Sequence, residues 1–165
     1  MKDEMLQMIK KAMQGEKDSV TLYENAAARA DEPEVEEFFA SRAEEERRHY
    51  NHLLNHHQQI SGNLQPPAPA EELSEAREAR SIFSESFIRR IGGDQYLFSA
   101  ISTALLLEKD AFEHYGENAR KAEDPELKQF FSLLEEWEKR HYDELLRIQQ
   151  AAERYYWEIN SFEPF

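Results

Sequence analysis

The chain contains an internal duplication, because residues 16–54 align without a gap with residues 108–146 at an offset of 92 positions. Within this alignment 17 of the 39 positions are identical, whereas unrelated chains of ordinary composition would share roughly 3. Both copies contain a proline, at Pro33 and Pro125, and a Glu-x-x-His-Tyr motif, at 46–50 and 138–142. A repeated unit folds in the same way twice, so the fold must consist of two equivalent halves.

Each half is predicted to be a helical hairpin. The sequence holds only 5 glycines and 33% charged residues, a composition that favours long helices over sheet. Pro33 and Pro125 follow acidic residues that can cap a helix, and further acidic residues come next, which is the pattern of a helix start. We therefore predict an all-α four-helix bundle with helices over about 2–30, 33–60, 94–122 and 125–155.

The predicted organisation is a single domain over residues 1–165, a length typical of one domain. The first hairpin covers about 2–60, a crossover about 61–93, the second hairpin about 94–155, and an aromatic tail 156–165. In the crossover, the segment 65–69 contains three prolines and is predicted to be extended. A short helix is predicted between 71 and 91, and Gly92 and Gly93 are predicted to separate it from the next long helix.

Charge and composition exclude several classes of function. The net charge of -14 rules out an extended basic face, so we expect no nucleic-acid partner. The absence of cysteine excludes disulfides, thiolate zinc sites, iron–sulfur clusters and cysteine nucleophiles. The longest apolar stretch, near 101–107, is far shorter than the roughly 20 residues of a membrane span, and the N-terminus lacks the apolar core of a signal peptide. We expect a cytoplasmic protein with no membrane partner.

The predicted first and third helices each carry one glutamate inside an apolar stripe. In the first helix the stripe advances in alternating steps of four and three residues, the spacing of a buried bundle seam, and Glu16 lies in its middle. The third helix repeats this pattern with Glu108. Tyr23 and Tyr115 follow these glutamates by seven residues on the same stripes. We therefore predict that both glutamates point into the bundle.

The predicted second and fourth helices each carry Glu-x-x-His at the centre of the stripe, as Glu46 with His49 and Glu138 with His141. Residues three apart share a helix face, so each pair can direct two ligands at one point. Carboxylates that converge in an apolar core repel one another and lose hydration, unless protons or cations compensate them. Two divalent metal ions would balance four ionised glutamates with neutral histidines. Oxygen and imidazole ligands suit iron or manganese, and zinc is a further option.

One Glu from each of two helices and Glu-x-x-His from each of the other two is the ligand set of ferritin-like di-iron and di-manganese bundles. On these motifs the chain resembles the ferritin-like superfamily and, within it, the rubrerythrin-like branch. The resemblance implies a crossover between the second and third helices, two iron ions at mid-bundle, and reaction with hydrogen peroxide or dioxygen. It further implies a homodimer, in which the aromatic tail is a candidate contact.

The resemblance also implies a role for each residue of the motifs. Glu46 and Glu138 correspond to carboxylates that bridge the two metals, and the remaining ligands correspond to terminal ones, namely Glu16, Glu108, His49 and His141. The residues that correspond to hydrogen-bond donors to ligand carboxylates are Tyr23 and Tyr115.

Two departures from the family pattern keep more than one function open. Rubrerythrins typically have a further glutamate three residues after the ligand of the third helix, and here that position is Ala111. They also commonly carry a rubredoxin domain, whereas this cysteine-free chain needs a separate electron-donor protein. The first hypothesis is an oxidoreductase that reduces hydrogen peroxide or dioxygen. The alternatives are a ferroxidase or iron-handling protein, and a non-catalytic bundle whose metal only neutralises the core.

Residues near the motifs are predicted to have ordinary roles. The charged runs 44–48 and 135–140 are expected to face solvent, with only Glu46 and Glu138 turned inward. Arg48 and Arg140, beside the histidines, are candidates to offset surplus negative charge. Packing is predicted for one further histidine, His56, and exposure to solvent for the others, His52, His57 and His114.

Overall fold

The structure, a computed structural model, describes residues 2–62 and 83–160. Its elements are α1 (Lys2–Arg29), α2 (Pro33–Ser61), α3 (Glu85–Gly93), α4 (Gln95–Lys121) and α5 (Pro125–Ile159). The described part of the chain contains helices and no strand, so the predicted all-α class is confirmed. Among these residues no helix combines the length and the apolar character that a bilayer span requires.

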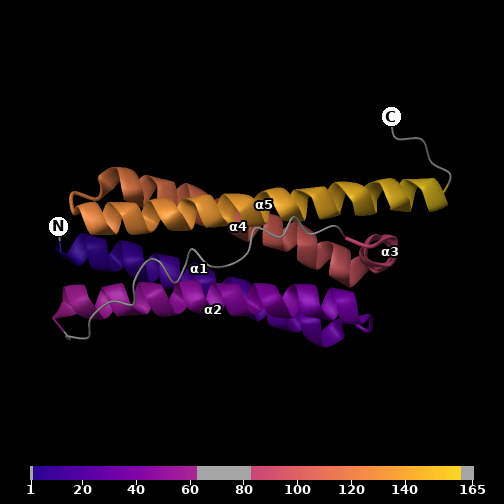
Figure 1. Cartoon of the computed structure of the whole chain (residues 1–165), viewed down its shortest axis with the longest axis horizontal. Coiled ribbons are helices and arrows are strands. Elements are labelled where there is room, and N and C mark those ends of the chain that lie inside the picture. The colour runs from indigo at the N-terminus through magenta and orange to yellow at the C-terminus, as the bar shows by residue number, and fades with distance from the viewer. Residues whose placement is uncertain (1, 63–82, 161–165) are drawn as a thin grey trace.

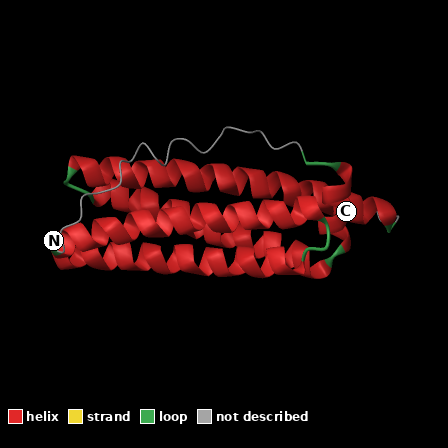
Figure 2. Cartoon of the chain, turned by 60° about the horizontal axis from the view of Figure 1, so that its bottom comes forward, coloured by secondary structure: helices red, strands yellow, loops and turns green. Residues whose placement is uncertain are grey.

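The four long helices run side by side along one axis (Figures 1 and 2). The α1 helix packs along α2 and α4 packs along α5, while α1 also meets α4 in the interior. The two halves of the duplication are therefore the two hairpins of the bundle. The α2 helix ends at the opposite end of the bundle from α3 (Figure 1), so a crossover joins the hairpins. The predicted extended segment 65–69 and most of the predicted short helix lie outside the described residues.

Capping side chains fix where the helices of the second hairpin begin. Asp124 accepts a hydrogen bond from the amide of Leu127 at 2.9 Å, so this residue caps α5 as predicted. The break before α4 lies at Asp94, whose carboxylate accepts from the amides of Tyr96 and Leu97 at 2.9 and 3.0 Å. Gly92 and Gly93 were predicted to form this break but instead complete α3. The capping carboxylate, which satisfies the first free amides of α4, determines the boundary.

The short α3 helix covers one end of the bundle and packs on α5 and α4. Ser84 caps it by accepting from the amide of Phe87, and Phe87 and Ile91 are completely buried. Gly92 lies so close to α5 that a Cβ atom there would be 2.8 Å from the carbonyl oxygen of Ala152. Glycine is therefore needed at this position for close helix packing.

The α5 helix continues to Ile159, four residues beyond its predicted end. Residues 156–159, predicted to begin an aromatic tail, are helical, and the end of α5 projects past the other long helices (Figure 1). Neither glycine nor proline occurs between 126 and 159, so nothing in the backbone stops the helix earlier. The rest of the predicted tail, 161–165, lies outside the described residues.

The core consists of two apolar clusters with polar residues between them. One cluster includes Phe39 and Leu97 and extends to α3, and the other includes Ile9, Leu53 and Phe131 near the opposite end. On each long helix, the buried glutamates and histidines lie between the residues of these two clusters. The fold therefore places the polar centre at mid-bundle, with apolar packing on both sides.

Candidate metal centre

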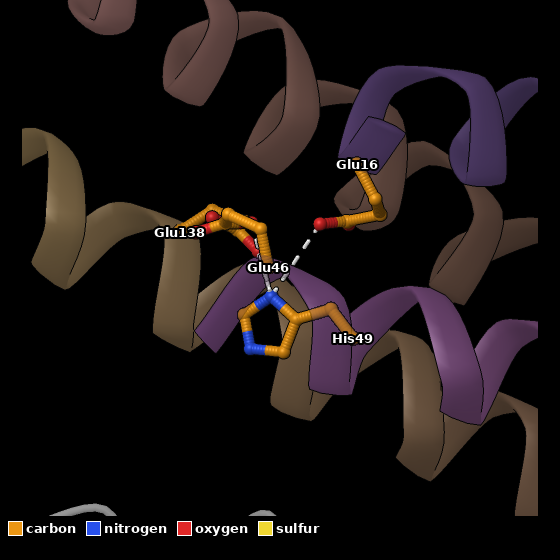
Figure 3. A group of neighbouring side chains, drawn as sticks. All are labelled: Glu16, Glu46, His49 and Glu138. Carbon is orange, nitrogen blue, oxygen red and sulfur yellow. Dashed lines mark ion pairs between the residues drawn. The ribbon is translucent and has the colours of Figure 1, made fainter. Parts of the chain in front are cut away.

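The structure brings all six predicted ligand residues together at mid-bundle, each of them at most 4% exposed. They form two groups of four, and in each group the ligand atoms lie within 4.8 Å of one another. The first group is Glu16, Glu46, His49 and Glu138 (Figure 3), and the second is Glu46, Glu108, Glu138 and His141. Glu46 and Glu138 occur in both groups, so they occupy the positions that bridging carboxylates would take.

Both histidines direct Nδ1 toward the carboxylates. Nδ1 of His49 lies 2.9 Å from Oε1 of Glu138 and 3.4 Å from Oε2 of Glu46. Nδ1 of His141 lies 3.2 Å from Oε1 of Glu46 and 3.3 Å from Oε2 of Glu138. The two imidazole rings are stacked, with centroids 5.9 Å apart and planes 17° apart. Nδ1 is therefore the atom that each histidine offers to a metal.

The unpaired atoms of the site fit a pair of metal ions. Glu46, Glu138 and both histidines have buried side-chain atoms without a well-oriented hydrogen bond among the described residues, including Nδ1 of each ring, although each Nδ1 lies within ion-pair distance of carboxylate oxygens. Buried polar atoms are normally paired, because leaving one unpaired costs about 1–3 kcal/mol. Cations between these atoms would satisfy them and would also neutralise the carboxylates.

Two buried tyrosines donate hydrogen bonds to Glu16 and Glu108, the two glutamates that occur in only one of the four-residue groups. The hydroxyl of Tyr23 on α1 donates to Glu108 on α4, and the hydroxyl of Tyr115 on α4 donates to Glu16 on α1. Burial, followed by the charge of the bonded glutamate, raises the pKa of both hydroxyls well above the usual range. The tyrosines therefore remain donors and fix the orientation of Glu108 and Glu16.

Without metal, the two shared carboxylates, Glu46 and Glu138, and the two histidines compensate one another. Burial alone raises the pKa of Glu138, but His49 and His141 outweigh burial and repulsion from Glu46 and lower that pKa to about 2. The same histidines hold the pKa of Glu46 well below its usual range against the effect of burial. Burial lowers the pKa of His49 and His141, yet the surrounding carboxylates raise both well above the usual range.

The pKa values of the two glutamates that occur in only one group, Glu16 and Glu108, shift in the opposite direction. Burial, and then repulsion from Glu46 and Glu138, raises the pKa of Glu16 and Glu108 well above the usual range. In the metal-free centre the ionised forms of Glu46 and Glu138 are therefore favoured, as are the protonated forms of Glu16, Glu108 and both histidines. Metal ions must compete with these protons to bind.

Charged residues to which the sequence analysis gave no role in the site lie beside His141. Oε2 of Glu45 lies 3.3 Å from Nε2 of His141, and Nη1 of Arg42 lies 2.7 Å from the same oxygen of Glu45. Arg42 also forms an ion pair with Glu144 on α5. Burial raises the pKa of Glu45, but His141 and Arg42 outweigh burial and keep it below its usual range. Glu45 was predicted to face solvent; its turn toward His141 was hidden by the surrounding charged run.

Several other residues near the site also differ from prediction. Trp137 belongs to the second charged run, yet it is only 8% exposed, and its ring lies edge-on to His49 with centroids 5.5 Å apart. His52 is buried rather than solvated. Arg48 and Arg140 are exposed, so Arg42 is the guanidinium that offsets charge beside the centre. The two halves differ at these positions, with Arg42 against Leu134 and Glu45 against Trp137, but they also differ at others.

This arrangement can hold two divalent cations about a shared pair of carboxylates, each with one imidazole and one tyrosine-held glutamate. Such donor sets suit iron and manganese.

Comparison with known proteins agrees with this geometry. The family model described as Rubrerythrin matches residues 7–149, which include nearly all of the four long helices and every residue of the centre. No curated protein and no solved structure is significantly similar to the chain. The match covers most of the chain, contains both Glu-x-x-His motifs, and accords with a ferritin-like bundle that has a carboxylate–histidine centre. The chain therefore belongs to the rubrerythrin family.

Proposed function

We propose that the protein is a di-iron oxidoreductase that reduces hydrogen peroxide or dioxygen with electrons from a separate donor protein. The observation that carries this proposal is the pair of buried four-residue groups that share Glu46 and Glu138. A centre of this kind places two metal ions next to each other, which suits a two-electron reaction. A single structural ion would need only one of the groups.

The iron pair would supply the two electrons that cleave the O–O bond of peroxide, and two protons complete the two water molecules. The remaining tasks belong to the chain. Tyr23 and Tyr115 hold Glu108 and Glu16 in place, while Glu46 and Glu138 connect the two metal positions. The apolar clusters on both sides keep bulk water from the centre, which strengthens the electrostatic interactions there.

The electrons for the next cycle must come from outside this sequence. It contains no cysteine, so it cannot hold the thiolate-ligated iron of a rubredoxin. The net charge of -14 favours a donor protein with a basic docking face.

The proposal is tested by loading the protein anaerobically with two Fe(II) per chain and mixing it with hydrogen peroxide or with dioxygen in a stopped-flow instrument. The near-ultraviolet absorption of ferric iron reports oxidation. We expect complete oxidation at about one peroxide per two irons, faster with peroxide than with dioxygen. Glu46→Ala and His141→Ala should abolish the fast phase. Glu44→Ala is the matched control, because Glu44 is exposed and pairs with Arg47.

The outcomes separate the candidate functions. Equal loss of the fast phase in the Glu44→Ala control would contradict a role for the buried ligands. Binding of two irons without fast oxidation by either oxidant would leave a metal-stabilised bundle.

A ferroxidase function is the second candidate, and Ala111 favours it. Ala111 lies at the position of the additional family glutamate, one turn beyond Glu108, and packs against the apolar cluster that contains Tyr115. The centre therefore lacks a further carboxylate on that side. Preference for dioxygen together with oxidation of many more than two irons per chain would support this function over peroxide reduction.

A further inference from the structure

The six candidate ligands obey the duplication, but the residues around the two histidines do not. At an offset of 92, Glu16 matches Glu108, and each Glu-x-x-His pair matches the other. The residue before each bridging glutamate differs completely, since Glu45 in the first half corresponds to Trp137 in the second. Glu45 lies beside His141 and Trp137 beside His49, so this difference between the halves can affect the two metal positions differently.

The two imidazole rings consequently have different partners at Nε2. Nε2 of His141 lies 3.3 Å from Oε2 of Glu45. Nε2 of His49 has no hydrogen-bond partner among the described residues, and the edge-on ring of Trp137 packs against this imidazole. Because Nδ1 of each ring faces the carboxylates, Nε2–H is the group through which the protein can act on the metal-ligating nitrogen.

Two further breaks in the repeat strengthen the asymmetry. Arg42 corresponds to Leu134, and Glu144 corresponds to His52. Arg42 pairs with both Glu45 and Glu144, so it holds Glu45 in place for His141. These three charged residues sum to one negative charge beside His141. At the equivalent positions around His49, the chain has a leucine, a tryptophan and a histidine.

A carboxylate that accepts from the far nitrogen of a metal-ligating histidine fixes the tautomer and makes the other nitrogen a stronger donor. It also adds negative charge near the cation. At His141 the accepting carboxylate is present, although the guanidinium of Arg42 offsets part of its charge; at His49 no described residue accepts from Nε2. The six ligands are symmetric, whereas the residues that support them are not.

We propose that the two metal positions are inequivalent, so that the position of His141 binds a divalent cation first and more tightly, with Glu45 as its positioning residue. This inference rests on the dinuclear centre of the proposed function. We therefore expect the His141 position to fill first and a metal ion to leave the His49 position more readily.

The test is an anaerobic titration with Co(II), which does not undergo the proposed oxidation, followed by calorimetry and visible absorption. We expect wild type to bind two Co(II) per chain in two resolved steps, with dissociation constants at least about tenfold apart. Glu45→Gln, which keeps the shape and removes the charge, should weaken the first binding step by about tenfold or more, so that the two steps are no longer resolved in the wild-type order. Glu44→Gln removes the same charge at an exposed neighbour and should change neither.

A second measurement identifies the position that fills first without a ligand variant. At one Co(II) per chain, the paramagnetically shifted ring N–H signal in the NMR spectrum should belong to His141, and Glu45→Gln should shift it and speed its exchange with water. Two equal sites in wild type, a first ion at His49, or an unchanged spectrum in Glu45→Gln would overturn the inference while leaving a dinuclear centre. Failure to bind two ions would instead contradict the proposed function.

Discussion

Metal binding should release protons, because the metal-free centre keeps several of its ligands protonated. The pKa of His49 and of His141 is raised well above its usual range by the surrounding carboxylates, against the effect of burial. Burial and repulsion raise the pKa of Glu16 and of Glu108. A metal ion binds neutral imidazole and ionised carboxylate, so each of these groups must lose its proton when two ions bind.

The size of the effect follows from these protonation states. Up to four groups can each give up one proton, so we expect release of about two to four protons per two metal ions at pH 7. Glu138, with a pKa lowered to about 2, contributes none. Each proton released makes the overall binding constant rise about tenfold per pH unit, so metal affinity should increase steeply as pH rises.

The assay adds two equivalents of Co(II) anaerobically to weakly buffered protein that contains a pH indicator, with standard acid as calibration. Glu16→Gln cannot carry a carboxyl proton, and it should release about one proton fewer than wild type. Glu44→Gln, which changes an exposed residue outside the centre, should release the same number as wild type. Release of fewer than about two protons by wild type would refute these protonation states, because the histidines and glutamates would then already be deprotonated before the metal binds.

Three further predictions concern stability and metal affinity. The metal-free protein in a chelator should lose thermal stability as pH rises above about 6.5, because the folded state keeps protons on its ligand histidines that the unfolded state releases; a melting temperature that rises with pH would contradict this. Phe39→Ala should lower the free energy of unfolding by about 3–5 kcal/mol in urea denaturation, since Phe39 is completely buried, whereas Leu106→Ala, at a side chain 66% exposed, should change it by less than about 0.5 kcal/mol. Tyr115→Phe removes the donor to Glu16 and should weaken Co(II) binding about 10- to 100-fold in calorimetry; an equal loss in Tyr142→Phe, whose ring packs on a neighbouring helix, would argue against a specific role of that hydroxyl.

The bundle and the six ligand residues could be predicted because both rest on periodicity. A helical seam identifies the residues that point inward, and the duplication repeats the test independently in the second half. Glu16 and Glu108 are equivalent positions, each a single glutamate in the middle of an otherwise apolar seam. The hydrogen bonds of Tyr23 and Tyr115 to ligand carboxylates were expected only from the family resemblance, and the structure shows that each tyrosine bonds the glutamate of the other helix.

The residues that support His141 could not be predicted from periodicity, because they lie at the edges of the seams. Glu45 and Trp137 precede inward glutamates within charged runs, and such positions face solvent on an isolated helix. Arg42 and Glu45 are three residues apart on α2, but only the packing of α2 against α5 brings Glu144 to Arg42 and His141 to Glu45. The repeat alone did not single these positions out, because most of the 39 aligned positions differ between the halves and several others also differ in charge.

The start of α4 and the end of α5 differ from the prediction, each for a local reason. The boundary before α4 depends on hydrogen bonds from two amides to Asp94, a contact that glycine content does not reveal. The end of α5 depends on the absence of any strong stop signal before Asn160, and its exposed side chains carry no seam pattern.

The central claim is that the buried glutamates and histidines hold two metal ions that share Glu46 and Glu138. A crystal structure of the protein loaded anaerobically with iron, measured at the iron absorption edge, tests it most directly. We predict two anomalous peaks per chain, one bound by the group that contains His49 and the other by the group that contains His141. A single peak, or peaks bound by residues outside these two groups, would contradict the claim.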